Sequence, residues 1–272
     1  MIGEPLPPRI TEPERRQRLL DSGAIYTAQR SVRGDAVSQD RRLKFDGVAR
    51  YLQDTGQDHL RHVDYEDVHP YWVVRRTVIE MIEGGDQPDI LTVERWGSKM
   101  GSRWCNVRIG IDGRKGTRIE TEAFWINFNI DTLTPSALSE TFLSTFGAAA
   151  EPGVLRWKQW LDPKPHPDAV EVPFLLRAAD LDIIQHVNNA VYWTALEEVL
   201  ATQPDLRERL PLRGIVEHNS ALQIEDAPRL LAHRDGDVLY AWLVAGDRTA
   251  AAMSVEALPA DTQADGAQAD GA

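Results

Sequence analysis

A cluster of polar residues lies between Asp180 and Asn189, in the string Asp-Leu-Asp-Ile-Ile-Gln-His-Val-Asn-Asn. Two acids, Asp180 and Asp182, precede His186 and the pair Asn188 and Asn189. A carboxylate can act as a general base or as a nucleophile, and an imidazole can orient it or position a water molecule. These residue types within one short stretch are compatible with a hydrolytic centre.

The residues that follow predict the element that positions this cluster. Apolar side chains recur at the spacing of a buried helix face, at Tyr192, Ala195, Leu196, Val199 and Leu200. Asn188 or Asn189 can cap this helix, and the free N–H groups of its first turn favour developing negative charge. A capped amphipathic helix behind a solvated acidic segment would explain the same residues without any chemistry, and cap residues alone favour that alternative.

Length and composition restrict the classes of protein to which the chain can belong. The chain has 272 residues, 42% of them hydrophobic, which suffices for one large domain or two modest ones. A formal net charge of −12 argues against nucleic acid and anionic membrane surfaces as partners. No apolar run approaches a membrane span, the N-terminus lacks an apolar signal core, and Cys105 is the only cysteine. These features predict a protein of the reducing cytoplasm.

Runs of β-forming residues and one amphipathic stretch predict the organisation of the first half, residues 23–146. A strand is expected at residues 25–32, a helix at 43–60, further strands at 71–82, 90–98, 103–111 and 118–129, and a short helix at 136–146. Asp112-Gly113 is a hairpin signal between two of these strands. The order predicts a curved antiparallel sheet around a long helix.

The same order recurs in a second half, residues 169–258, after a Pro- and Ala-rich linker at 147–168. Trp157 and Trp160 are expected to hold this linker on a domain surface. The polar cluster and its helix follow a strand at 170–177 and precede strands at 213–223, 229–233, 238–244 and 249–258. Residues 1–22 are expected to be weakly ordered, and residues 259–272 disordered, because no apolar side chain larger than Ala follows Pro259.

The two halves can be aligned as an internal repeat. The helix stripes correspond at an offset of 144 residues, as between Val48 and Tyr192. In the loop before the helix, we set Asp35 against Asp180. The acid, histidine and asparagine pair of the cluster then correspond in the first half to Val37, Arg41, Leu43 and Lys44, which lack the polar centre. The alignment predicts one degenerate half and one half that keeps the polar centre.

The complete string carries a resemblance to a known family. Asp-x-Asp-x-x-x-His-x-Asn-Asn-Ala-x-Tyr resembles the signature of hotdog thioesterases, and its longer form resembles the acyl-acyl-carrier-protein thioesterases of plants and bacteria. Trp72-Val73-Val74 with Arg76, and the segment from Thr121 to Asn129, resemble further stretches of that family. The resemblance implies an α+β double hotdog fold, with two bent antiparallel sheets each wrapped around a long central helix.

The resemblance also implies a function and a division of labour. Members hydrolyse fatty acyl-acyl-carrier-protein to free fatty acid and carrier in fatty acid biosynthesis, with no metal or organic cofactor. The first half shapes the acyl pocket and the second half carries the catalytic residues. Acyl carrier protein is then the expected partner, and further association into a homodimer is open.

Residue by residue, Asp182 and His186 match the Asp and His of the family's Asp-x-Asn-x-His motif. The Asn position is Ile184, and the positions of the family's Glu and the Cys of plant members fall on Ala221 and Leu222. A reduced mechanism would use Asp182 as general base or nucleophile, His186 to position water or orient Asp182, and the backbone N–H groups around His186 to Asn189 for the oxyanion. Glu217 is a candidate substitute for the missing Glu, although a solvated strand-edge acid is the favoured alternative.

Several alternatives stay open at this stage. The donor could be acyl-CoA, since CoA and the carrier share the phosphopantetheine arm, and the apolar residues Ile184, Ala221 and Leu222 would also suit a catalytically weakened acyl-thioester binding protein. A hotdog dehydratase is disfavoured because the Asn-Pro step of its motif is absent. Basic groups at Arg41, Arg42 and Lys44 or at Arg114, Lys115 and Arg118 could dock an acidic carrier, but scattered surface charge is the favoured alternative.

Two further signals have simple structural explanations that are favoured over chemistry. His59, His62, Asp64 and His69 could suggest a metal site, but a polar helix end explains them as well. Cys105 alternates like a strand residue and is expected to be a packed core thiol.

Overall fold

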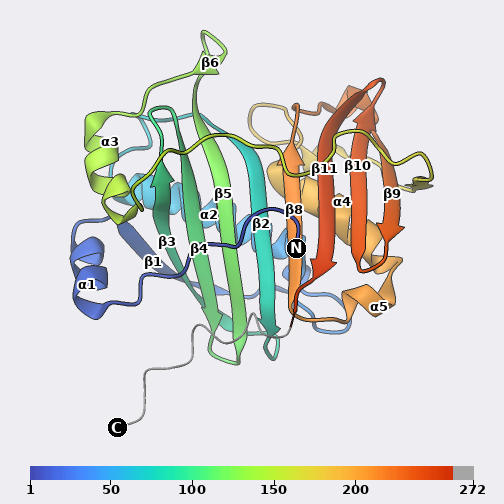
Figure 1. Cartoon of the computed structure of the whole chain (residues 1–272), viewed down its shortest axis with the longest axis horizontal. Helices are drawn as coiled ribbons and strands as arrows, with labels where there is room; N and C mark the ends of the chain where they lie inside the picture. Colours follow the sequence, from blue (N-terminus) through green and yellow to red (C-terminus); the bar gives the residue numbers. More distant parts are fainter. Residues whose placement is uncertain (260–272) are drawn as a thin grey trace.

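The computed structural model describes residues 1–259, and a long, strongly bent antiparallel sheet dominates it (Figure 1). Its strands follow the order β1-β3-β4-β5-β2-β8-β11-β10-β9-β7, and β6 pairs with the end of β5. The strands of the first half are β1 (Ile25–Ser31), β2 (Trp72–Gly84), β3 (Ile90–Met100), β4 (Trp104–Gly113), β5 (Thr117–Asn129) and β6 (Thr134–Pro135). Those of the second half are β7 (Val170–Val172), β8 (Leu212–His218), β9 (Arg229–Asp235), β10 (Val238–Ala245) and β11 (Arg248–Ala257).

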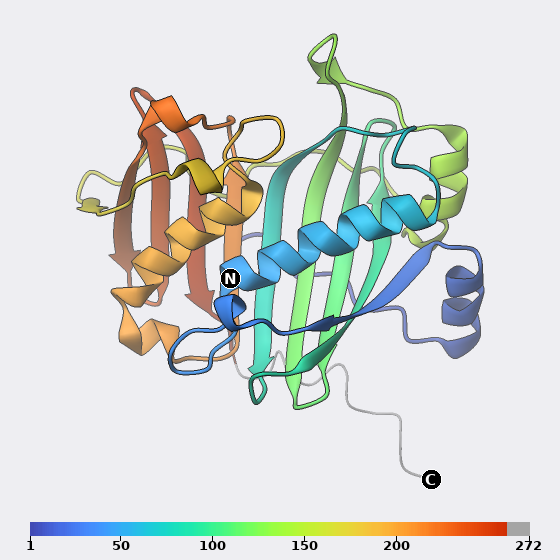
Figure 2. The same cartoon turned by 180° about the vertical axis from the view of Figure 1, so that it is seen from behind.

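The two halves are joined by the pairing of β2 with β8. These strands run antiparallel, with Arg76 opposite Glu217 at one end of the ladder and Met81 opposite Leu212 at the other. The two bent sheets expected from the sequence therefore continue into one another. Each half wraps around its own helix, and the predicted double hotdog fold is confirmed (Figure 2).

The two central helices, α2 (Phe45–His62) and α4 (Asn189–Ala201), lie on the inner face of the sheet and contact each other (Figure 2). Nine of the thirteen residues of α4 are buried, because this helix contacts α2 on one side and β10 and β11 on another. Helix α2 is amphipathic, with one buried and one exposed face. Shorter helices lie outside this core: α1 (Pro13–Asp21), α3 (Glu140–Thr145) and α5 (Pro204–Arg207).

Strand β8 is buried on both faces, because the helices cover one face and the linker covers the other. On the inner face, a Cβ atom added to Gly214 would lie 2.8 Å from Trp193 and 2.9 Å from Phe45. Glycine at this position thus lets the stacked rings of Phe45 and Trp193, with centroids 5.6 Å apart, approach the sheet. This contact joins the N-terminal ends of α2 and α4.

The N-terminal segment and the linker cover the outer face. Ile2, Leu6, Trp160 and Leu161 pack with residues of β8, β10 and β11, and Arg9 Nε donates to Glu120 at 2.6 Å. Residues 1–22 differ from the expected weak order because they are held by these contacts and include the helix α1. The predicted tail lies, apart from Pro259, outside the described residues.

Several predicted element ends differ from the structure. The helix expected at 136–146 begins at Glu140, because Ser139 caps it by accepting the Phe142 N–H at 3.1 Å. The strand expected at 170–177 ends at Val172, before Pro173, which has no N–H for a ladder. The strand expected at 213–223 ends at His218 and continues as a loop. No helix within residues 1–259 is both long and apolar enough to cross a membrane.

The internal repeat is accurate to the residue at an offset of 144. The 3₁₀ turns Gly34–Ala36 and Ala178–Asp180 correspond, as do the bridges between Val37 and Leu43 and between Leu181 and Val187. The counterpart of Asp182 is therefore Ser38, and that of His186 is Arg42. The predicted match of Asp35 with Asp180 is wrong by one residue, because the loops have equal length and the helix offset applies throughout.

Candidate active site

The loop from Leu181 to Val187 is closed by the carboxylate of Asp182. Its Oδ1 accepts the N–H groups of Ile184 at 3.0 Å and His186 at 3.1 Å, and its own N–H donates to the His186 carbonyl at 2.8 Å. Gln185 has a φ of 62°, the left-handed conformation that this tight turn requires. One oxygen of Asp182 thus fixes the loop, while no hydrogen bond within residues 1–259 involves Oδ2, which is available for chemistry.

The other acid, Asp180, has a structural role. Its carboxylate is buried and accepts the Arg177 N–H at 2.8 Å and the Arg177 guanidinium at 2.8 Å. Its carbonyl accepts the N–H of Asn188 at 2.8 Å. Asp180 therefore connects the turn before the loop to the start of α4.

The N–H groups at the start of α4 are mostly used within the protein. Val187 donates to the Leu222 carbonyl at 2.8 Å, and Ala190 donates to Oδ1 of the cap residue Asn188 at 2.9 Å. With those of His186 and Asn188 already engaged, the N–H of Asn189 is the one in this stretch that has no acceptor within the described residues. The predicted oxyanion site around His186 to Asn189 therefore narrows to a single backbone donor.

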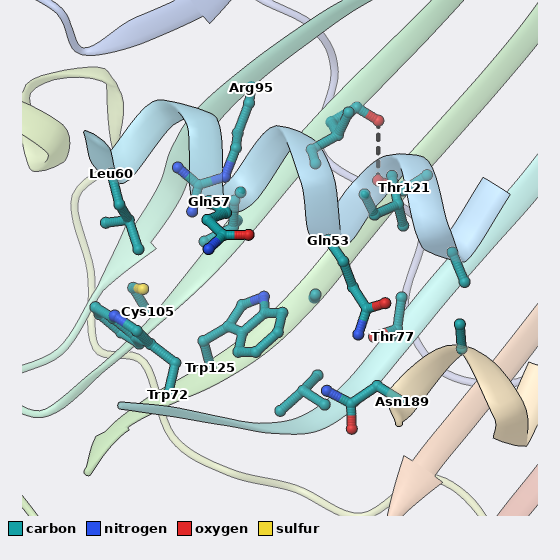
Figure 3. A pocket seen from close by; sticks show the side chains of 18 of the residues that line it. Gln53, Gln57, Leu60, Trp72, Thr77, Arg95, Cys105, Thr121, Trp125 and Asn189 are labelled. Atoms are coloured by element: carbon teal, nitrogen blue, oxygen red, sulfur yellow. Dashed lines mark hydrogen bonds between the residues drawn. The ribbon is translucent and has the colours of Figure 1, made fainter. Parts of the chain in front are cut away.

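In the first half, the equivalent backbone N–H group is paired with a carboxylate. The N–H of Phe45, the counterpart of Asn189, donates to Oε1 of Glu197 at 2.6 Å, and Arg42 pairs with the same carboxylate. The residue related to Glu197 by the offset of 144 is Gln53, which is uncharged. Figure 3 shows the Gln53 side chain reaching from α2 toward Asn189. The repeat offset of 144 residues is the sequence signal that identifies Gln53 as the counterpart of Glu197.

A cavity of about 380 Å³ begins beside Asn189 and extends under α2 (Figure 3). Ile183, Asn189, Ala190 and Trp193 from the second half line one part of it. Residues of α2, of β2 to β5, of the segment between α2 and β2, and Phe142 of α3 line the remainder. Most of the wall is apolar, and polar groups such as Gln53 and Arg95 interrupt it. Asp182 does not line the cavity itself, but its neighbour Ile183 does.

The structure does not bring Glu217 to this site. Glu217 is fully buried on the outer face of β8, opposite to the helices. Its carboxylate accepts the N–H groups of Trp160 and Leu161, both at 3.0 Å, and an Arg76 N–H at 3.2 Å. It connects the linker to the sheet, and neither the predicted substitute for a catalytic Glu nor the alternative of a solvated edge acid matches these surroundings.

The positions where this chain has apolar residues in place of the polar residues of the family motif lie close to the loop. Leu222 is buried and its carbonyl receives the Val187 N–H, whereas Ala221 is exposed. Ile184 is 46% exposed at the tip of the loop. None of the three introduces a titratable group.

A second buried side chain of β8, His218, lies outside the site predicted from the sequence. It faces the helices, with its ring 4.6 Å from that of Tyr192, and its Nε2 has no hydrogen-bond partner among residues 1–259. Burial lowers the pKa of His218 to about 3, so the ring is neutral at physiological pH. His218 follows Glu217 directly in β8, and successive side chains of a strand point to opposite faces of the sheet.

The basic groups proposed for carrier docking lie at the other end of the sheet. Arg41 and Lys115 donate to the carbonyls of Gln87 and Pro88, in the turn after β2. The Asp182 loop contacts the segment after β8, which is the opposite end because β2 and β8 are antiparallel. The stretch of β2 from Arg76 to Gly84 alone spans about 26 Å.

A doubled hotdog fold, a polar loop at one helix N-terminus and an apolar cavity beside it define the class of hotdog thioesterases. Models of the acyl-ACP thioesterase N-terminal and C-terminal domains match residues 23–146 and 164–236. The chain belongs to the acyl-ACP thioesterase family, a family of thioester hydrolases. Uncharacterized proteins from two strains of Mycobacterium tuberculosis are 38% identical to it over 237 residues, or 87% of this chain and 94% of the relative.

Solved structures share the fold. The 12:0-ACP thioesterase from Umbellularia californica is similar with a TM-score of 0.68 and 19% identity, covering 86% of this chain and 96% of that one. An acyl-ACP thioesterase from Bacteroides thetaiotaomicron has a TM-score of 0.69 and 17% identity, covering 87% and 98%.

Proposed function

We propose that the chain hydrolyses acyl-acyl-carrier-protein, releasing a carboxylic acid and the carrier thiol in fatty acid biosynthesis. The observation that carries the proposal is the free N–H of Asn189, at the edge of a largely apolar cavity and one short loop away from Asp182. The acyl chain enters the cavity, and the thioester carbonyl lies at the start of α4. The phosphopantetheine arm extends from there to the carrier.

The hydrolysis follows from these groups. Oδ2 of Asp182 takes a proton from a water molecule whose oxygen attacks the thioester carbonyl carbon. The Asn189 N–H and the positive end of α4 stabilise the oxyanion. When the tetrahedral intermediate collapses, the carbon–sulfur bond breaks, the leaving thiolate takes the proton held by Asp182, and the acid is released. His186 orients the water molecule or the Asp182 carboxylate.

Gln53 is assigned a positioning role in the same step. Its side-chain amide can donate a second hydrogen bond to the carbonyl oxygen, where Glu197 of the other half instead accepts one. The site then combines residues from both halves, with Asp182, His186 and Asn189 from the second half and Gln53 from the first. Glu217 has no part in it, because its carboxylate is enclosed between β8 and the linker.

The absence of an acid at Ala221 and Leu222 favours a second candidate function. With one carboxylate in place of two, the site could bind acyl thioesters and hydrolyse them slowly. An acyl-CoA donor is a further variant of the first candidate, because CoA presents the same arm and thioester. The experiment below separates these two alternatives from the leading proposal. The proposal also places the protein in the cytoplasm.

The test is hydrolysis of acyl-carrier-protein and acyl-CoA donors of several chain lengths by wild type and by Asp182→Asn. The amide oxygen of Asn can still accept the N–H groups of Ile184 and His186, so the loop and the melting temperature should be preserved. Turnover should fall at least about 100-fold because the base is removed. Asp40→Asn, in the corresponding loop of the first half, is the matched control and should keep full activity.

Each outcome selects one candidate. Turnover on the carrier that is lost in Asp182→Asn supports the proposal, and preference for CoA identifies the donor variant. Saturable binding without turnover on any donor supports the binding protein. Full turnover in Asp182→Asn would rule out the proposed base.

A further inference from the structure

Arg95 on β3 lines the cavity and is 92% buried, since its exposed fraction is 8%. Its Nη1 donates to Nδ1 of His59 at 2.8 Å, and its guanidinium lies 4.9 Å from the centre of the Phe146 ring. The other His59 nitrogen, Nε2, bonds the Gly23 carbonyl at 2.9 Å, which requires the proton on Nε2. The hydrogen-bond and ring partners of Arg95 are therefore a neutral imidazole and an aromatic face. The nearby Cys105 thiol adds no negative charge, because burial raises its pKa to about 12.

A guanidinium buried in this way normally has an anionic partner. Four arginines are buried within residues 1–259, and three of them pair with glutamates: Arg76 with Glu217, Arg108 with Glu120, and Arg213 with Glu80. Arg95 is the exception, because no carboxylate of the described residues lies within 4.0 Å of it. Burial lowers the pKa of Arg95 to about 10, so the side chain is still charged at neutral pH.

The position of Arg95 relative to the reacting end is set by the sheet. Arg95, Ile109 and Thr121 lie in register across β3, β4 and β5, and all three line the cavity. Asn189 lies beyond β2, on the side of the second half. Three strand spacings separate β3 from β2, or about 14 Å. Figure 3 shows Arg95 and Asn189 at opposite sides of the cavity.

We propose that the cavity binds an acyl chain that ends in a carboxylate, with this ω-carboxylate held by Arg95 and the thioester at Asn189. This inference rests on the proposed function for the thioester end and adds the chemistry of the other end. The fork of N–H donors matches a carboxylate, and the pair forms away from bulk water, where charge-assisted hydrogen bonds are strong. An unmodified fatty acyl chain would leave the charge facing methyl groups.

Binding is measured with amide analogues of acyl-pantetheine, which cannot be hydrolysed. Decanoyl and decanedioyl chains are compared by calorimetry, together with octanoyl, dodecanoyl and their dicarboxylic counterparts. Wild type should bind the best dicarboxylic chain at least about tenfold more tightly than the plain chain of equal length. Arg95→Met should remove this preference and bind the plain chain at least as well as wild type does.

Two further variants control for changes in folding. Thr77→Val alters the same cavity from β2 without removing a charge, so the preference should persist. Arg95→Lys keeps the charge but loses the fork, so the preference should shrink without reversing. If Arg95→Met does not fold, the wild-type preference alone decides the outcome.

The results separate this inference from the proposed function. A dicarboxylic preference in binding, without hydrolysis of the matching thioesters, would support the ligand and overturn the activity. Hydrolysis with equal or tighter binding of plain chains would overturn the ligand and leave the activity. An ω-hydroxy chain that binds as tightly as the dicarboxylic one would also overturn the assignment, because it carries no charge.

Discussion

The N–H groups of Phe45 and Asn189 occupy equivalent places at the starts of the two central helices, but only the first is paired with a carboxylate. Glu197 places a negative charge where a thioester oxyanion would form, and a buried charge paired with Arg42 is costly to displace. At the start of α4, the corresponding residue is the uncharged Gln53, so no carboxylate from this position faces the Asn189 N–H. A single pair of residues thus explains why one half retains a usable donor.

Replacing Gln53 with Glu tests this explanation. The new carboxylate would accept the Asn189 N–H and repel the developing oxyanion, so we expect kcat to fall at least about 30-fold. Gln17→Glu, the same change at an exposed position of α1 that does not line the cavity, is the matched control and should have little effect on kcat. Unchanged or faster turnover in Gln53→Glu would show that Gln53 lies away from the reacting carbonyl.

The buried histidines predict a loss of stability in mild acid. Burial lowers the pKa of both His59 and His218 to about 3, from the ordinary value of 6.5. As the pH falls below about 6.5, these histidines become protonated in the unfolded chain but stay neutral in the native protein. The free energy of unfolding therefore falls until the pH reaches about 3. Each ring should account for about 2 kcal/mol of unfolding free energy between pH 7 and pH 5.

Urea unfolding at pH 7 and pH 5 measures this loss. His218→Gln should have a pH-dependent loss smaller by about 2 kcal/mol than that of wild type. His62→Gln, which changes an exposed ring, should retain the wild-type difference. An identical loss in wild type and His218→Gln would mean that His218 is protonated in the native protein.

At the scale of elements, Glu217 connects β8 to the linker, and this role can be separated from catalysis. Glu217→Gln removes the charge that Arg76 faces, so we expect about 3 kcal/mol less stability, with kcat of the folded protein nearly unchanged. Glu225→Gln, an exposed change in the loop after β8, should alter neither quantity. Loss of kcat at an unchanged melting temperature would instead restore Glu217 as a catalytic residue.

Local sequence patterns were sufficient to predict the order of the helices and strands, but not which distant segments cover them in the folded protein. Period-two and helical spacing located the helices and most strands, and the motif located Asp182, His186 and Asn189. The alternation along β8 could not show that the outer face is covered by Trp160 and Leu161, which are more than fifty residues away in the chain. Arg95 was missed for the same reason, because its lack of an acidic partner exists only in the folded protein.

At the scale of the whole molecule, the ends of the sheet differ in how a carrier could reach the loop. Exposed Lys158 lies beside Gln159, which contacts Asn219 at the end of β8 nearest Asp182. We expect Lys158→Glu to raise KM for an acyl-carrier substrate at low salt and to leave acyl-pantetheine hydrolysis unchanged. Lys115→Glu, at the other end of the sheet, is the charge-matched control and should change neither. An increase in KM for Lys115→Glu alone would place the docking surface at the far end.

The offset of 144 residues also has a consequence for symmetry. In a dimer of two identical hotdog chains, one residue type would face both helix starts, so both would be blocked or both open. Because the two halves are parts of one polypeptide, Glu197 and Gln53 can differ. The start of α2 can then be paired permanently with Glu197 of the other half, while the start of α4 stays open to a ligand. Covalent linkage is what permits this molecule to be structurally twofold and chemically single-sited.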